Sequence, residues 1–210
     1  MTADPLADAW ERWYRSNPVH WKGSLLPLPR LREGARVLDV GCGDGSTLIQ
    51  AAEAGYVPSG IDLSKTALER ARERVEARGF DVRLMEGNIL EKAELLGKFD
   101  CILLHHVLDS MLEDNRRKVV SIAGKMLEKD GLVSFQDYSV NDMRSGKGKE
   151  IEAGTFLRKD GLFVHFFTME EVSDLFRGFR VLELKETQWE QSRGRGSMVR
   201  SRIGGLFQPL

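Results

Sequence analysis

The chain has 210 residues, of which 41% are hydrophobic and 30% are charged, and its formal net charge is −1. This size and composition are typical of one globular domain, and the near-zero charge excludes attraction of nucleic acid by an overall positive field. Two cysteines are too few for a disulfide framework or a zinc site, and with no signal peptide or membrane-spanning run the sequence predicts a cytoplasmic protein.

Residues 1–30 are rich in aromatic side chains. Trp10, Trp13 and Tyr14 follow helical spacing and share one face, and Trp21 comes soon after them. A helix of this kind either packs against a sheet as an amphipathic element or closes as a flap over a bound ligand. The sequence leaves both readings open.

A glycine-rich segment follows the first apolar run, and it reads Asp39-x-Gly41-x-Gly43-x-Gly45. Glycines here let the backbone approach a ligand without a Cβ in the way. Asp62 stands 21 residues after Gly41, after a second apolar run. An acid at that spacing accepts hydrogen bonds from the ribose hydroxyls of an adenosine cofactor. A dinucleotide fingerprint would carry glycine where Ser46 stands, so the pattern favours a different cofactor.

Strand and helix patterns alternate from residue 35 to residue 138. Strands are predicted at residues 36–40, 57–61, 82–85, 99–104 and 132–136, and helices at 46–54, 64–78 and 114–127. Ser46 and Ser64 are the expected N-caps, Gly79 ends the second helix, and Asp130-Gly131 turns into the fifth strand. Alternation of this kind predicts a parallel sheet covered by helices on both faces.

The pattern changes after Tyr138. Residues 141–150 are polar and are predicted as a loop, whereas residues 155–157 and 162–168 are apolar runs that flank Asp160-Gly161. An Asp-Gly pair between apolar runs predicts a hairpin.

The chain closes with a helix and two strands. Thr168 and Glu171 have the spacing of a capping box at the start of that helix. The strands are predicted at residues 179–187 and 198–207.

A parallel core finished by antiparallel strands, with this glycine loop and second-strand acid, resembles the class I S-adenosylmethionine (SAM) methyltransferases. The resemblance implies an α/β, Rossmann-like fold with a mostly parallel seven-stranded sheet and helices on both faces. It implies one domain over residues 1–210, with residues 1–30 as an aromatic-rich flap and 139–168 as a lid and hairpin over the active site. The cofactor would be SAM, with S-adenosylhomocysteine as the product, and the reaction would need no metal.

The same resemblance assigns cofactor contacts. The glycine loop would face the methionine part of SAM, Asp62 the ribose, and Asn88 with Ile89 the adenine. The implied cofactor-binding residues are Asp39, Gly41, Cys42, Gly43, Gly45, Asp62, Leu63, Asn88, Ile89, His105, Trp13 and Trp21. His105 and His106 end the fourth strand, where ligands collect in open α/β sheets, although either could instead be a core histidine.

The C-terminal half is similar to the tRNA 3-methylcytidine methyltransferases. The motifs that carry this similarity are Asp137-Tyr138, Asp142-Met143, Gly154-Thr155-Phe156-Leu157-Arg158-Lys159-Asp160-Gly161, Phe166-Phe167-Thr168 and Arg193-Gly194-x-Gly196-x-Met198-x-Arg200. Asn141 replaces a tyrosine of that family, and the His105-His106 pair replaces apolar residues.

This narrower resemblance implies Asp137, Tyr138, Asp142 and Arg158 as catalytic residues. N3 of cytosine has a free lone pair, so no strong base is needed, and a carboxylate or aromatic face stabilises the positive ring that methylation leaves. Arg158 would pair with a phosphate or stack on a base. The competing explanations are loop capping for the acids and a solvated turn for Arg158.

RNA binding needs a cationic surface. The basic residues after the fifth strand stand among acidic residues, which reduce the net positive charge of this segment. The expected partner is tRNA, presented by a protein such as an aminoacyl-tRNA synthetase if the chain's own charge does not suffice; no membrane partner is expected. The alternatives are a methyltransferase for a small metabolite or a protein side chain, and a non-catalytic SAM-binding subunit. An NAD-linked oxidoreductase is disfavoured by Ser46.

Overall fold

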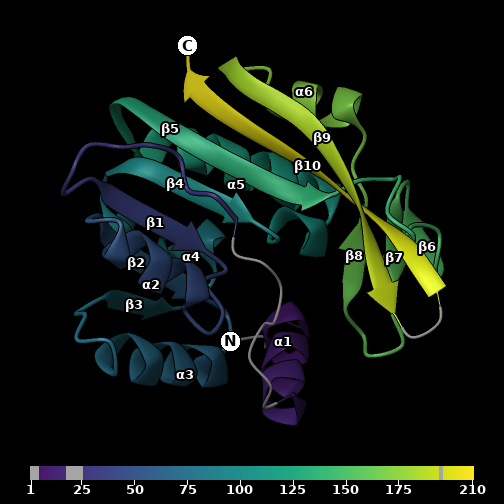
Figure 1. Cartoon of the computed structure of the whole chain (residues 1–210), viewed down its shortest axis with the longest axis horizontal. Helices are drawn as coiled ribbons and strands as arrows, with labels where there is room; N and C mark the ends of the chain where they lie inside the picture. Colours follow the sequence, from purple (N-terminus) through teal and green to yellow (C-terminus); the bar gives the residue numbers. More distant parts are fainter. Residues whose placement is uncertain (1–4, 18–25, 194–195) are drawn as a thin grey trace.

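The computed structural model describes residues 5–17, 26–193 and 196–210. Its main element is a seven-stranded sheet of order β3-β2-β1-β4-β5-β10-β9 (Figure 1). The strands β1 to β5 are parallel, whereas β10 runs antiparallel to both β5 and β9. The mostly parallel sheet with antiparallel C-terminal strands is therefore confirmed. The strand bounds are β1 Arg36–Val40, β2 Val57–Asp62, β3 Arg83–Glu86, β4 Phe99–His105, β5 Leu127–Tyr138, β9 Phe179–Arg193 and β10 Gly196–Pro209.

Helices cover both faces of this sheet, as expected. The helices α2 and α3 pack on one face, and α4, α5 and α6 pack on the other (Figure 1). The helix α1 stands apart from both layers, beside α3. The helix bounds are α1 Pro5–Ser16, α2 Ser46–Glu53, α3 Lys65–Glu76, α4 Ile89–Leu96, α5 Glu113–Met126 and α6 Met169–Leu175, with a short 3-10 turn at Leu108–Ser110. In the described parts, no helix is long and apolar enough to span a membrane.

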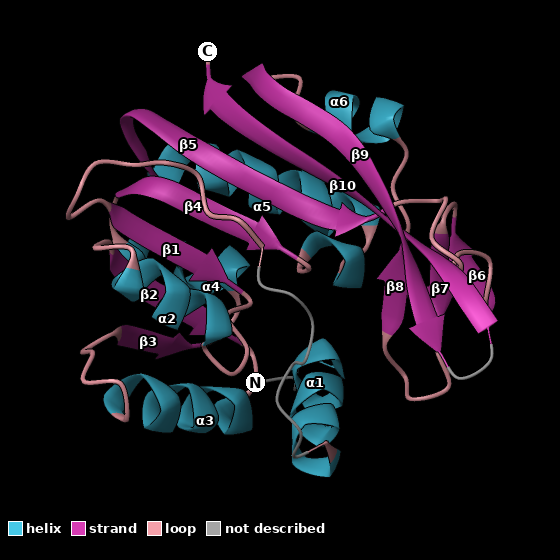
Figure 2. Ribbon diagram, in the orientation of Figure 1, coloured by secondary structure: helices cyan, strands magenta, loops and turns pink. Residues whose placement is uncertain are grey.

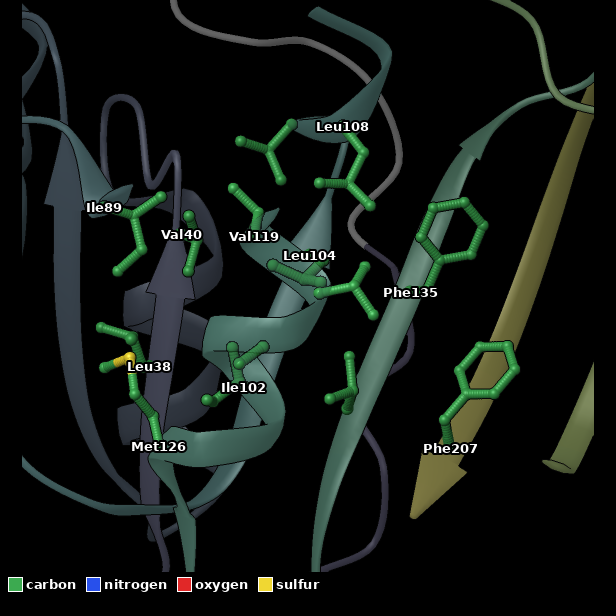
Figure 3. Packing of buried hydrophobic residues seen from close by; sticks show 14 of the residues in the cluster. Leu38, Val40, Ile89, Ile102, Leu104, Leu108, Val119, Met126, Phe135 and Phe207 are labelled. Atoms are coloured by element: carbon green, nitrogen blue, oxygen red, sulfur yellow. The ribbon is translucent and has the colours of Figure 1, made fainter. Parts of the chain in front are cut away.

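The larger core lies between the sheet and α5. Alternate residues of the parallel strands, including Leu38, Ile102 and Phe135, point into it and meet Val119 and Met126 (Figure 3). Successive strand side chains point to opposite faces, so both faces of these strands must be apolar when helices cover both. This packing fixes the carboxyl ends of the strands, where the functional residues lie.

A three-stranded antiparallel sheet lies beyond the end of β5 (Figure 2). It consists of β6 Lys149–Glu152, β7 Thr155–Leu157 and β8 Phe163–His165. The hairpin predicted around Asp160-Gly161 is confirmed as β7 and β8. The strand β6 was not expected, because its sequence is polar and its side chains are mostly exposed.

Several local predictions are wrong. Gly45, in a left-handed conformation with φ 79°, caps α2, and the Ser46 hydroxyl instead donates to Asp44 Oδ1 at 2.9 Å. The helix α4 was not expected at all. The turn at Asp130-Gly131 is a local irregularity inside the longer strand β5, where Asp130 has φ 64° and the register with β4 shifts.

The expected caps of α3 and α6 are both confirmed. Ser64 accepts from the Ala67 N–H, and Thr168 accepts from the Glu171 N–H. The Glu171 carboxylate lies 2.8 Å from His165 Nε2, so this acid holds β8 against α6.

Candidate active site

The loop after β1 forms a tight cradle at the carboxyl edge of the sheet. Gly41 and Gly43 have φ of 71° and 53°, a region that favours glycine. A Cβ added at Gly41 would lie 2.9 Å from Val107 Cγ2, and one at Gly43 would lie 2.6 Å from the Tyr14 hydroxyl. The backbone therefore passes close to Val107 at Gly41 and close to Tyr14 at Gly43, and any side chain at either position would clash with these neighbours.

Two buried acids end the strands beside this cradle. Asp62 accepts from the Gly43 N–H through Oδ2 and from the Ser64 N–H through Oδ1, both at 2.9 Å. Burial, and then the neighbouring Asp62 charge, raise the pKa of Asp39 to about 8. Burial also raises the pKa of Asp62, although its backbone hydrogen bonds oppose this. A site of this kind suits a ligand with cationic or hydroxyl groups.

A cavity opens between the strand ends and α1, with about 730 Å³ of unfilled space including the part open to solvent. Five of the residues implied as cofactor contacts line it: Gly41, Asp62, Leu63, Asn88 and Ile89. Asn88 also caps α4, because its side chain accepts from the Leu90 N–H.

The aromatic helix α1 forms one wall of this cavity. Trp10 and Tyr14 line it, whereas Trp13 packs edge-on against both of these rings. The interpretation of this segment as a flap over a bound ligand stays a prediction. Trp21 lies outside the described residues. Trp10 and Tyr14 were noted from the sequence for their spacing but not named as site residues.

An acid on α1 fixes the helix to the start of α3. The Glu11 carboxylate accepts from the Ser64 hydroxyl at 2.6 Å and from the Thr66 hydroxyl and N–H at 2.7 and 3.1 Å. Burial would raise the pKa of Glu11, but these hydrogen bonds outweigh it and lower the pKa to about 2. A carboxylate at a helix N-terminus is further favoured by the helix dipole.

The two histidines after β4 have different surroundings. His105 lies with its Nε2 2.9 Å from Ser134 Oγ and is not among the cavity-lining residues, whereas His106 is. The His106 ring is tilted against Tyr138, with 4.5 Å between centroids. Burial lowers the pKa of His106 to about 4, so its imidazole is neutral at neutral pH.

An aromatic and guanidinium surface continues from His106. The Arg144 guanidinium lies 3.8 Å from the centre of the Tyr138 ring, a cation–π arrangement. Asp142 accepts from Arg144 Nε at 2.7 Å and from Arg200 Nε at 2.8 Å. Burial alone would raise the pKa of Asp142, but these charge-assisted hydrogen bonds lower it to about 2. Asp142 therefore positions two arginines around Tyr138.

A second pair of acids lies beneath this surface. Asp137 is fully buried, and its Oδ2 accepts from the Asp109 N–H at 3.3 Å. Burial raises the pKa of Asp137 well above its ordinary value, and burial together with Asp137 raises the pKa of Asp109 to about 8. Arg158 lies on the β7–β8 turn and pairs with Asp160 at 2.6 Å. Asp109 and Arg144 were not identified from the sequence, because neither stands in a motif.

A glycine cradle and second-strand acid at the carboxyl edge of a sheet of this order define a SAM-dependent methyltransferase. Residues 31–177 match the family described as "Methyltransferase domain". This is most of the chain, so the protein belongs to that methyltransferase family.

Curated relatives agree with the class but differ in their acceptors. The chain is 29% identical over 152 residues to the human tRNA N(3)-cytidine methyltransferase METTL2B, and the match covers 67% of this chain and 40% of that protein. It is 28% identical over 193 residues to O-methyltransferase 3 of Dictyostelium discoideum, covering 83% and 44%. The match thus spans less than half the length of each relative.

Solved structures show the same fold. A SAM-dependent methyltransferase from Anabaena variabilis is 19% identical, with a TM-score of 0.74, and the match covers 98% of this chain and 95% of that one.

Proposed function

We propose that this SAM-dependent methyltransferase modifies N3 of a cytidine in tRNA. The relationship to METTL2B carries the proposal, because it extends over two thirds of the chain. The surface made by Tyr138, His106 and Arg144 supports it, since unpaired bases stack on aromatic rings and guanidinium planes.

For the cofactor, we propose that the glycine loop with Asp39 and Cys42 holds the methionine part of SAM. Asp62 and Leu63 would hold the ribose, and Asn88 and Ile89 the adenine. The blocked Cβ positions of the loop and the buried acids fit a ligand that carries an ammonium group and hydroxyls. Bound SAM supplies an electrophilic methyl group.

For the acceptor, the residues of this chain mainly orient. Cytidine N3 presents a lone pair without losing a proton, so positioning supplies much of the rate, about 7–11 kcal/mol in favourable cases. Tyr138 is buried and packs against His106 and Arg144, so its ring orients these two side chains toward a base. Asp142 keeps Arg144 and Arg200 beside this ring. The carboxyl group of Asp137 lies 3.5 Å from His106 and, in its ionised form, would favour the positive charge that the methylated ring acquires. Arg158 would reach a phosphate if tRNA displaced its contact with Asp160.

The proposed partner is tRNA, with an aminoacyl-tRNA synthetase as a presenting protein. The arginines nearest the acceptor surface are partly neutralised: Asp142 pairs with both Arg144 and Arg200. A partner that supplies cationic surface would compensate for this.

The test is transfer of a labelled methyl group from SAM to total tRNA, followed by mass spectrometry of the nucleosides. We expect 3-methylcytidine from the wild type and none from Asp62→Ala. The matched pair Tyr138→Phe and Tyr138→Ala tests the ring that orients His106 and Arg144. The phenylalanine variant keeps this ring and should retain most activity, whereas the alanine variant should lose about 10-fold or more, with circular dichroism to show that it is folded. SAM binding with no labelled tRNA, with and without a cell extract that supplies partner proteins, would refute the proposal.

A second candidate is methylation of a small metabolite or a protein side chain. The observation that favours it is the neutral His106 imidazole, which lies 3.5 Å from Asp137 Oδ1. A neutral imidazole can take a proton from an acceptor that must lose one, whereas cytidine N3 needs no such base. The match to O-methyltransferase 3 also favours it. Formation of S-adenosylhomocysteine with metabolite or protein fractions, abolished in His106→Gln, would support this candidate over tRNA.

A further inference from the structure

Three side chains that can ligate a metal ion meet at the carboxyl ends of β4 and β5. They are His106, directly after β4, Asp109 in the 3-10 turn, and Asp137 in β5. One donor atom of each lies within 4.8 Å of the others. His106 Nδ1 is 3.5 Å from Asp137 Oδ1. The neighbouring strands β4 and β5 therefore hold these three side chains close together.

Asp137 points to a ligand independently of this clustering. The side chain is fully buried, and its Oδ2 is held by the Asp109 N–H. Its Oδ1 has no hydrogen-bond partner among the residues that the structure describes. Buried polar atoms are nearly always paired, so an unpaired carboxylate oxygen aimed at an imidazole needs an explanation.

The backbone of His106 is also unusual. Its φ of 54° places a residue other than glycine in the left-handed region. Local strain of this kind persists only where surrounding structure enforces it, and it is concentrated at functional sites. Here the conformation brings the imidazole to the two carboxyl groups.

The cluster combines one imidazole with two carboxyl groups, a donor set that binds divalent cations. The cationic side chains that face these acids are Arg116 toward Asp137, and Arg144 and Arg158 toward Asp109. Arg144 and Arg158 are themselves paired with Asp142 and Asp160. A proton shared by the two acids is the alternative to a bound cation.

We propose that His106, Asp109 and Asp137 bind one divalent transition-metal ion of the Mn²⁺ or Zn²⁺ type. With metal–ligand bonds of about 2.0–2.2 Å, adjacent donors of a tetrahedral site are separated by about 3.3–3.5 Å, which matches the nitrogen–oxygen distance here. One imidazole and two carboxylates suit these ions better than Ca²⁺ or Mg²⁺, which prefer oxygen alone.

The site opens toward the cavity, because His106 and Ser110 line it. Three protein ligands with an open position are typical of metal sites that also bind a small molecule or water. This inference does not depend on the tRNA proposal. It differs from the expectation from the sequence that no metal is needed.

The test is isothermal titration of the full chain, stripped with a chelator and dialysed, with MnCl₂, ZnCl₂ and MgCl₂ in separate experiments. We expect one saturable site per chain for Mn²⁺ or Zn²⁺ and weaker binding of Mg²⁺. Electron paramagnetic resonance of Mn²⁺ gives a second readout, because the free-ion signal falls as the site fills.

Isosteric variants decide the assignment. Asp109→Asn and His106→Gln should each weaken metal binding by at least about 10-fold, whereas Asp174→Asn, at a partly exposed acid on α6, should not. Circular dichroism shows whether each variant is folded. Absence of saturable binding to the wild type at millimolar metal would overturn the proposal in favour of a shared proton. Binding that survives both variants would equally overturn it.

Discussion

Replacing Asp39 by asparagine should stabilise the protein at neutral and alkaline pH while weakening its binding of SAM. Asp39 ends β1 with only 3% of its surface exposed, next to the buried Asp62. Burial and the Asp62 charge raise its pKa from 3.8 to about 8. The folded state therefore holds a proton that the unfolded state releases.

The sign and size of the effect follow from linkage. A carboxyl group with a raised pKa makes its most favourable contribution to the free energy of unfolding below pH 3.8. This contribution is lost progressively as the pH rises toward 8. Each pH unit across that window costs about 1.4 kcal/mol, so the aspartate destabilises the fold by at most about 4 kcal/mol at pH 7. Asparagine has nearly the same shape and does not ionise. The gain should vanish near pH 4 and be largest near pH 8.

Urea unfolding followed by circular dichroism at pH 4, 6 and 8 measures this gain. Asp81→Asn, at an exposed acid before β3, is the control and should change the free energy of unfolding by less than about 0.5 kcal/mol. An Asp39→Asn gain that is the same at all three pH values, or a loss that grows with pH, would refute the reasoning. Titration with SAM should show weaker binding by the same variant.

Three further outcomes are expected. Asp62→Asn should weaken SAM binding by about 10–100-fold in calorimetry, because charge-assisted hydrogen bonds contribute about 1.5–3 kcal/mol each. Gly43→Ala should also weaken SAM binding, because the new methyl group would lie 2.6 Å from the Tyr14 hydroxyl. Adding Tyr14→Phe should restore part of the affinity. If it does not, the positive φ of Gly43 alone is responsible for the loss. Phe207→Ala should lower the free energy of unfolding by about 3–5 kcal/mol in urea, because this ring is fully buried and stacks at 3.9 Å on Phe176.

The sheet could be predicted because its signals are local. The central strands β1 and β4 are short, mostly apolar runs. The glycines and Ser64 mark the boundaries of helices in ways that depend on a few neighbouring residues. The failures have local reasons too. Ser46 looks like an N-cap, but Gly45 already adopts the left-handed conformation that starts α2. The helix α4 is only eight residues long, which leaves little periodicity to detect.

The surroundings of Tyr138 could be predicted only in part, because their organisation depends on contacts between distant segments. Asp137 and Tyr138 were identified through a motif. Arg144 reaches the Tyr138 ring only because Asp142 holds it, and Asp109 meets Asp137 only because β4 and β5 are neighbours. Neither residue carries a sequence pattern that would single it out.

The position of α1 was left open by the sequence, and a single acid helps explain its position in the structure. Aromatic residues at helical spacing fit a sheet face and a cofactor flap equally well. Glu11 distinguishes them, because its carboxylate takes three hydrogen bonds at the start of α3, immediately after Asp62. With its pKa lowered to about 2, this anchor is at full strength above the ordinary value of 4.5 and weakens only as the pH falls toward 2. Throughout the neutral range α1 is thus tied to the same strand end that carries the buried acid, and Trp10 and Tyr14 on this helix line the cavity beside it.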